Sequence, residues 1–161
     1  KTYKIQLGYE PQGMKTETGD GRTPEGTYRV CGRNPQSTYY RSLQIDYPGE
    51  ADIRRALDGR KITTEQAREL RDALAGGGCP PATTPLGGSI FIHGQHPKRT
   101  QWTKEENAGK RLPVGLEPGD VDPATQDSAM NWTLGCVGMS NAEIRELYRF
   151  VPDGTLVEIL P

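Results

Sequence analysis

The chain has 161 residues, the usual size of one domain, and can bury one core without a metal or a dense disulfide network. It carries 20 Lys and Arg against 21 Asp and Glu, so its net charge of −1 gives no bulk attraction to nucleic acid or to an anionic membrane. Its 20 Gly, 13 Pro and 33% hydrophobic residues favour a loop-rich, mainly β or mixed domain with few long helices. No apolar run approaches the roughly 18 residues that a membrane helix needs.

The first half of the chain alternates strand patterns with turn residues. Alternating apolar positions predict strands at residues 2–7, 27–32 and 42–47, with a turn over residues 19–26. A helix is expected to begin after Thr63, because Gln66 completes a capping box and apolar residues follow at helical spacing. The glycines at 76–78 are expected to end it.

The second half contains one long loop between two regular segments. A short apolar strand at residues 87–94 ends in His93, and residues 95–131 are then polar and rich in Pro, Gly and charge. A helix capped by Ser140, with Glu143 in the capping box, is followed by a last strand at residues 154–160. Since there is no internal repeat and no linker-like break, residues 1–161 are interpreted as a single domain.

Cys136 is the residue whose surroundings favour chemistry. Gly135 and Gly138 flank it and allow close backbone approach, and a capped helix begins shortly afterwards. Amide groups at such a turn can hold an oxyanion, and the positive helix end favours the reactive thiolate. His93, at the end of its strand, is the candidate base. The alternative is a small buried thiol without a catalytic role.

Three cysteines leave one unpaired if the other two form a disulfide. We hypothesise that Cys31 and Cys79 are bonded and that Cys136 is the free thiol; the alternative is two separate buried thiols. His96 follows His93 closely, but without paired Cys or His spacing we expect no metal site. No dissociable cofactor is implied.

Five ordered blocks of the chain resemble the L,D-transpeptidase catalytic domain, the YkuD family, and especially its YafK-like branch. They are residues 13–30, 37–48, 90–94 ("IFIHG"), 132–148 ("WTLGCVGMSNAEIRELY") and 151–159. The resemblance implies a mainly β domain with a few helices, built as a β-sandwich. It also implies an enzyme whose cysteine attacks a stem peptide of peptidoglycan to form a thioester.

Carried onto this sequence, the resemblance makes Cys136 the nucleophile, His93 its base and Gly135 part of the oxyanion site. It also implies a substrate-binding role for residues around these three positions: Trp132, Thr133, Gly94, Tyr39 and Tyr40.

The sequence departs from the family pattern at three points. Leu134 replaces a histidine found in many members, so a backbone carbonyl is expected to orient His93. Gly138 replaces an arginine that can hold a stem carboxylate; the candidates for that role here are Arg41, Arg99 and Arg111. Residues 53–85 look like a helical insert, and the 95–131 loop is expected to flank the active site.

The resemblance implies transfer of the acyl group to an amine of a second stem or of a protein, which cross-links the wall or attaches the protein to it. Transfer to water, as in an L,D-carboxypeptidase or amidase, is the alternative, and an inactive wall-binding module is a further one. We expect a periplasmic or extracellular location with a signal peptide removed, and no nucleic acid partner or membrane span.

Overall fold

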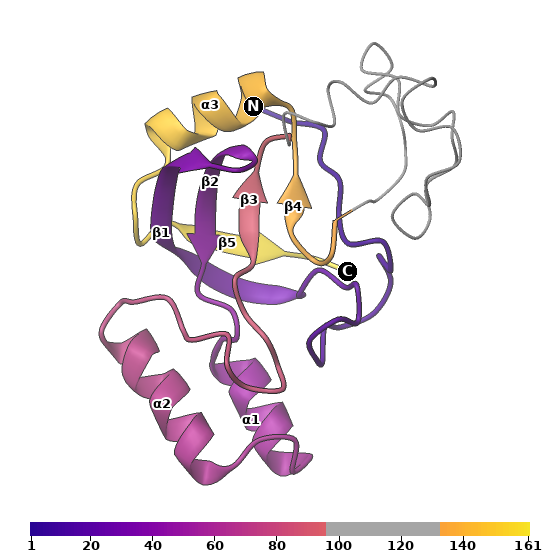
Figure 1. Ribbon diagram of the computed structural model, residues 1–161, viewed down its shortest axis with the longest axis vertical. Helices are drawn as coiled ribbons and strands as arrows, with labels where there is room; N and C mark the ends of the chain where they lie inside the picture. Colours follow the sequence, from indigo (N-terminus) through magenta and orange to yellow (C-terminus); the bar gives the residue numbers. More distant parts are fainter. Residues whose placement is uncertain (96–132) are drawn as a thin grey trace.

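A computed structural model describes residues 1–95 and 133–161 as a curled sheet with three helices (Figure 1). The elements in chain order are β1 (Gly26–Ser37), β2 (Tyr40–Ile45), α1 (Glu50–Asp58), α2 (Thr64–Ala75), β3 (Phe91–His93), β4 (Val137–Gly138), α3 (Asn141–Phe150) and β5 (Leu156–Ile159). The expected fold class, mainly β with a few helices, is confirmed. None of the helices in the described ranges has the length and apolar character required to cross a bilayer.

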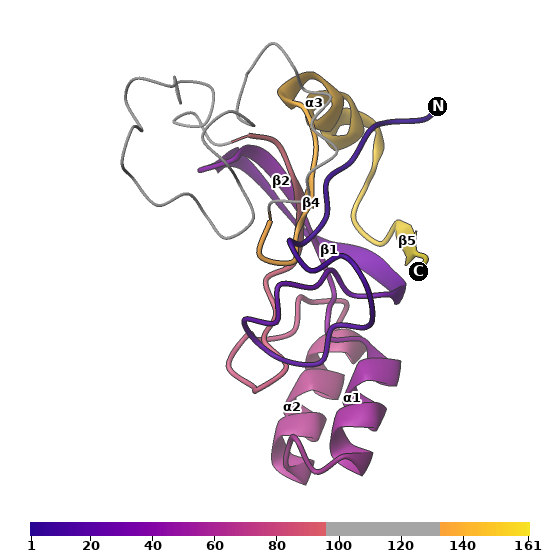
Figure 2. The same cartoon turned by 90° about the vertical axis from the view of Figure 1, so that its right-hand side faces the viewer.

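The sheet has the strand order β4-β3-β2-β1-β5, and all neighbours are antiparallel except β3 and β4. The long strand β1 builds both layers of the fold. Its first part, from Gly26 to Arg29, pairs with β5, whereas its second part, from Val30 onward, pairs with β2. Strand β5 therefore crosses behind the other strands, as the two views show (Figures 1 and 2).

Apolar side chains fill the space between these layers in two adjoining clusters. One contains Tyr28, Ile45, Tyr47 and Ile90, with Val157 and Ile159 of β5 packed against it. The other lies under α3 and contains Val30, Leu43, Met139 and Ile144. Because Leu43 of β2 packs toward α3, the alternate residues of that strand point to the opposite face of the sheet.

Helices α1 and α2 form a pair below the sheet with a hydrophobic cluster of their own (Figures 1 and 2). Its buried residues are Ile53, Ala56, Ile62, Ala67, Leu70 and Leu86. Helix α2 begins as predicted: the Thr63 side chain accepts the Gln66 N–H, and Gln66 returns a bond to the Thr63 N–H.

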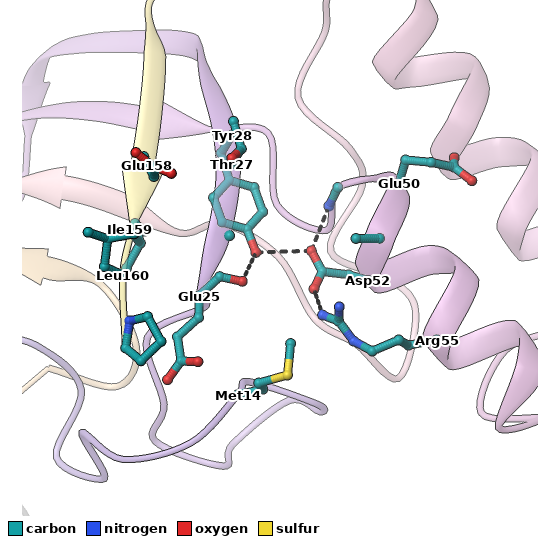
Figure 3. A pocket seen from close by; sticks show the side chains of 14 residues that line it. Met14, Glu25, Thr27, Tyr28, Glu50, Asp52, Arg55, Glu158, Ile159 and Leu160 are labelled. Atoms are coloured by element: carbon teal, nitrogen blue, oxygen red, sulfur yellow. Dashed lines mark hydrogen bonds and ion pairs between the residues drawn. The ribbon is translucent and has the colours of Figure 1, made fainter.

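Helix α1 was not predicted, because its cap residue is Gly49, which has no capping side chain. Asp52 performs that role instead: its carboxylate accepts the Gly49 N–H at 2.9 Å and the Tyr28 hydroxyl at 3.0 Å, and it pairs with Arg55 (Figure 3). Burial raises the pKa of Asp52, although these bonds oppose the shift. Asp52 thereby joins the helical pair to β1 at the wall of a cavity of about 320 Å³.

The predicted strand at residues 2–7 is wrong. That segment is extended but makes only isolated bridges, between Gln6 and Gly138 and between Gly8 and Thr133. Its neighbour β4 has two residues, which is too short for a regular ladder. The strands predicted at 27–32, 42–47, 87–94 and 154–160 are present with shifted bounds, and α3 begins at its predicted cap, Ser140. The predicted 95–131 loop lies, from residue 96 on, outside the described residues.

Candidate active site

Cys136 lies directly before β4, which runs parallel to β3 with Ile92 opposite Val137 and His93 opposite Gly138. This register places Cys136 beside Phe91, whose N–H donates to the Cys136 Sγ at 3.5 Å. The thiol in turn donates to the Ser89 carbonyl at 3.8 Å. Because side chains alternate along a strand, Cys136, Phe91 and His93 share one face of the sheet.

The turn before Cys136 is fixed by a threonine and a glycine. The Thr133 hydroxyl donates to the Cys136 carbonyl at 2.6 Å and accepts the Gly135 N–H at 3.1 Å. Gly135 has a φ of 132°, and a Cβ there would lie 2.7 Å from the Arg22 carbonyl oxygen. Only glycine fits both demands.

These contacts bear on two roles that stay predictions, those of Gly135 at the oxyanion site and of Thr133 toward the substrate. The Gly135 N–H is committed to the Thr133 hydroxyl, so in this structure it does not point an open donor at an oxyanion. Thr133 is 3% exposed and its hydroxyl is occupied within the turn, so it positions Cys136 and offers no side chain to a substrate. Thr133 and Gly135 both fix the conformation of the turn that precedes Cys136.

His93 is 5% exposed and lies at the end of β3. Its Nδ1 is 2.6 Å from the Gly94 carbonyl oxygen. A carbonyl only accepts, so Nδ1 carries the proton and Nε2 is the basic nitrogen of the neutral ring. The expected orienting carbonyl is therefore that of Gly94. The Tyr39 ring packs against the imidazole with centroids 4.5 Å apart, and Tyr39 remains 38% exposed.

Gly94 and Tyr40, two further candidates for substrate contact, also have packing roles in the fold. A Cβ on Gly94 would collide with the Asn141 Oδ1 and lie 3.0 Å from the Tyr39 carbonyl oxygen, so glycine is needed for packing. Tyr40 has a φ of 73° and packs against the cluster under α3. Trp132, the remaining candidate, lies outside the described residues, as does His96.

Arg41, one of the three candidates for holding a substrate carboxylate, packs against two tyrosine rings. Its guanidinium sits 5.6 Å from the Tyr40 ring centroid and 5.3 Å from that of Tyr148 on α3. Strand alternation puts Arg41 on the face of Leu43, opposite to Ser42, which pairs with His93. Arg99 and Arg111 lie outside the described residues.

A buried ion pair near the thiol was missed by the sequence analysis. Lys15 and Asp20 are 4% and 10% exposed and meet at 2.7 Å. Asp20 also accepts backbone N–H groups of its own turn, and Lys15 donates to the Glu17 carbonyl. Burial alone raises the pKa of Asp20, but these bonds bring it below its ordinary value. Residues 19–26 were identified only as turn chemistry, and sequence gives no sign that a lysine is buried.

The Lys15 charge acts on Cys136. Burial raises the pKa of the Cys136 thiol, while the Phe91 N–H and the Lys15 ammonium act in the opposite direction. The turn that holds Lys15 also contacts the cysteine turn through Arg22, whose carbonyl oxygen faces Gly135. A thiolate at Cys136 would thus have one backbone donor and one buried cation in its surroundings.

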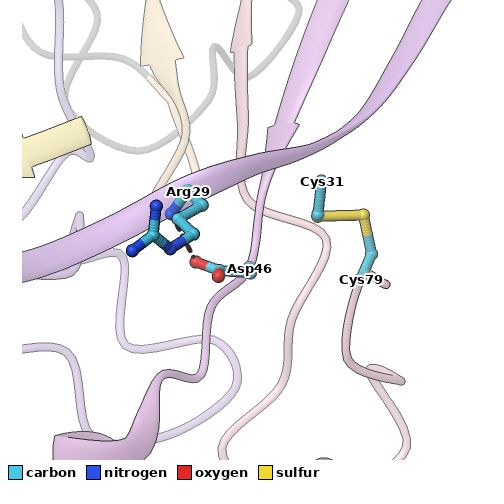
Figure 4. Close-up of a disulfide and its surroundings, with 4 residues drawn as sticks. All are labelled: Arg29, Cys31, Asp46 and Cys79. Atoms are coloured by element: carbon cyan, nitrogen blue, oxygen red, sulfur yellow. Dashed lines mark hydrogen bonds between the residues drawn. A yellow bond between two sulfur atoms is a disulfide. The ribbon is translucent and has the colours of Figure 1, made fainter. Parts of the chain in front are cut away.

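The structure contains the hypothesised disulfide between Cys31 and Cys79, and Cys136 is the free cysteine (Figure 4). Leu134, next to Cys136, is 77% exposed. Within residues 1–95 and 133–161, no three His, Cys, Asp or Glu side chains gather where they could hold a metal ion.

A family match and the similarity to two structures of one protein support the mainly β fold described above. The L,D-transpeptidase catalytic-domain family, YkuD, matches residues 1–112 and 118–159. No curated protein matches the chain. Among solved structures, the helical cell shape determining protein Pgp2 of Campylobacter jejuni is similar, with 19% identity over 96% of this chain and a TM-score of 0.51. A point mutant of Pgp2 gives 20% identity and a TM-score of 0.52, and Bd1075 of Bdellovibrio bacteriovorus gives 17% and 0.47. The chain spans 36% of the length of Pgp2.

Proposed function

Because the chain belongs to the L,D-transpeptidase catalytic-domain family, YkuD, we propose that it is a cysteine acyltransferase acting on peptidoglycan stem peptides. The observation that carries this proposal is the placement of the free thiol of Cys136 on the same face of β3 and β4 as His93. A buried histidine with its Nδ1 fixed by a carbonyl has the tautomer that a general base requires.

In the proposed reaction, the His93 Nε2 accepts the thiol proton as the Cys136 Sγ attacks the scissile carbonyl carbon of the stem peptide. The carbon–nitrogen bond then breaks, and the leaving amine takes the proton from His93. A thioester remains on Cys136. Backbone N–H groups around Cys136 other than that of Gly135 are the proposed oxyanion donors. Attack by an amine restores the thiol and completes the transfer.

The local electrostatics support this use of Cys136. A thiol in an apolar setting stays protonated, and only its thiolate is nucleophilic. The Phe91 N–H and the Lys15 ammonium counteract part of the effect of burial on the pKa of the thiol. His93 then needs to remove a proton that is less firmly held than in a purely apolar pocket.

The acceptor is part of the proposal. An amine of a second stem would give a cross-link, and an amine of a protein would attach that protein to the wall. Water as acceptor would make the chain an L,D-carboxypeptidase or an amidase, which shares every step up to the thioester. An inactive wall-binding module is the further alternative; the exposed Leu134 and the missing side chain at Gly138 favour it.

A cell-envelope location follows from the proposed substrate. Removal of a signal peptide and export to the periplasm or beyond belong to the same proposal. The disulfide is compatible with it, because such bonds persist in oxidising compartments.

The test is turnover of a synthetic stem tetrapeptide, with and without an added amine acceptor, by the wild type and by Cys136→Ala. We expect the wild type to release the terminal residue, and the variant to fold but to leave the peptide intact. A new amide product with the acceptor identifies a transferase, and hydrolysis alone identifies a peptidase. Turnover by Cys136→Ala would refute the cysteine mechanism. An intact peptide with both proteins would favour the wall-binding module.

A further inference from the structure

A row of side chains crosses the sheet from Cys136 to the disulfide. Phe91 lies beside Cys136, Gln44 of β2 is opposite Phe91, and Gly32 of β1 is opposite Gln44. Residues opposite one another in a sheet point to the same face. The intervening residues Leu43 and Ile92 pack into the core, so the row occupies the outer face, together with the nucleophile.

The disulfide stands at the far end of this row. A bulge in β1 falls at Cys31, between the pairs made by Val30 and Gly32, and bulges re-aim side chains. A Cβ on Gly32 would lie 3.1 Å from the Cys79 Sγ and 3.6 Å from the Gln44 Cβ. The glycine therefore makes room for the bond, which holds the segment after α2 against the outer face (Figure 4).

Gln44 and Phe91 form the middle of the row, and Gln44 supplies its polar group. Gln44 and Phe91 are both half-buried. In the part of the chain that the structure describes, the Gln44 side-chain amide makes no hydrogen bond. A primary amide offers donors and acceptors together, which is the complement of a peptide bond.

We propose that Phe91 and Gln44, bounded by the Cys31–Cys79 disulfide, form the subsite for the peptide chain of the acyl donor. This inference rests on the proposed function and adds to it the direction in which the donor lies. Gln44 hydrogen-bonds a backbone amide of the donor, and the Phe91 ring supports the residue next to the scissile bond.

The length of the row matches a short peptide. Three strand spacings separate β4 from β1, and at about 4.8 Å each they span roughly 14 Å. An extended peptide rises about 3.3 Å per residue, so roughly four residues fit between the nucleophile and the disulfide. The acyl part of a stem tetrapeptide keeps three residues once the terminal one has left, spans roughly 10 Å and so reaches Gln44, two strand spacings from Cys136. The single acyl residue of a dipeptide would end before Gln44.

Affinity for a synthetic stem tetrapeptide, measured by calorimetry on Cys136→Ala and on Cys136→Ala/Gln44→Ala, tests the subsite without requiring turnover. We expect the added Gln44→Ala change to weaken tetrapeptide binding by about three- to tenfold, the range for one lost hydrogen bond. A dipeptide donor should bind both proteins equally. Gln36→Ala is the matched control, because Gln36 is exposed near the C-terminal end of β1, outside the row, and its loss should change neither affinity.

Alkylation of Cys136 by iodoacetamide in the single variant Gln44→Ala checks that the thiol itself is undisturbed, and we expect the wild-type rate. Equal tetrapeptide affinity with and without Gln44 would overturn the subsite, and so would an equal loss for the dipeptide. Failure of the proposed function looks different. In that case the wild type turns over no donor, while the tetrapeptide affinity still depends on Gln44.

Discussion

The α1–α2 pair and the Cys136 turn lie in one domain but are held in place by different kinds of contact. The helical pair has capped helices and its own hydrophobic cluster, whose members all fall between Ile53 and Leu86. The Cys136 turn has two-residue β4 as its only strand, and is held by Gly8, Arg22 and Phe91, which come from distant segments. Capping signals and contacts between residues close in sequence therefore specify the helical pair, whereas the geometry of the Cys136 turn depends on packing between distant segments.

The largest expected effect is confined to the site. His93→Gln keeps a side-chain donor for the Gly94 carbonyl but has no basic nitrogen. We expect stem-peptide turnover to fall by about 10²–10⁴-fold, the usual contribution of a general base, with little change in the unfolding midpoint. Peptide turnover assays together with urea unfolding measure both quantities. Turnover at the wild-type rate would show that His93 is not the base.

In the helical pair we expect the opposite result: a substitution that lowers stability but leaves the reactivity of Cys136 unchanged. Leu70 is fully buried there, so Leu70→Ala should lower the free energy of unfolding by about 2–5 kcal/mol. The rate of Cys136 alkylation by iodoacetamide should stay constant under native conditions. Urea unfolding and an alkylation time course test this, with the exposed neighbour Glu69→Ala as control. An alkylation rate that changes with the stability loss would mean that the two regions are coupled.

A smaller effect is expected from the buried cation near the thiol. Lys15→Met removes a positive charge that lowers the pKa of Cys136, so the pKa should rise and the pH profile of alkylation should move to higher pH. At neutral pH we expect several-fold slower alkylation, because less thiolate is present. Lys15→Arg keeps the charge and should keep the profile. Superimposable profiles for the wild type and Lys15→Met would contradict a role for this charge.

The smallest effect is expected at the start of α2. Thr63→Ala removes the side-chain acceptor of the Gln66 N–H and should cost about 1 kcal/mol of stability, with no effect on turnover. Thermal unfolding measures it, and the exposed Thr64→Ala, one residue further on, is the control. A loss no larger than that of Thr64→Ala would show that the cap contributes nothing here.

The same contrast explains which features could be predicted. Helices α2 and α3 were found because Thr63 and Ser140 carry the capping signal in their own side chains. Helix α1 was missed because Gly49 carries none, and the strand at residues 2–7 was wrong because its neighbour is too short. Regular alternation predicts a strand but does not reveal the length of its partner.

Within the candidate site, the sequence indicated which residues matter but not which contacts they make. The glycines and the capped helix around Cys136, and the strand end at His93, made these two residues candidates. The odd cysteine count suggested the Cys31–Cys79 bond. The Thr133 bond to the Gly135 N–H, the burial of Lys15 and the alignment of Gln44 with Cys136 depend on which distant segments meet. Such contacts are set by the register of the sheet, which the sequence pattern leaves open.

The central claim is that Cys136 is a nucleophile that can be acylated. The most direct test is the mass of the intact protein after incubation with a carbapenem, which acylates a reactive thiol. We expect the wild type to gain the mass of one carbapenem, and folded Cys136→Ala to gain none. An adduct of equal yield on Cys136→Ala would place the reaction elsewhere and contradict the claim. A folded wild type that stays unmodified by the carbapenem, and leaves stem tetrapeptide intact, would contradict it as well.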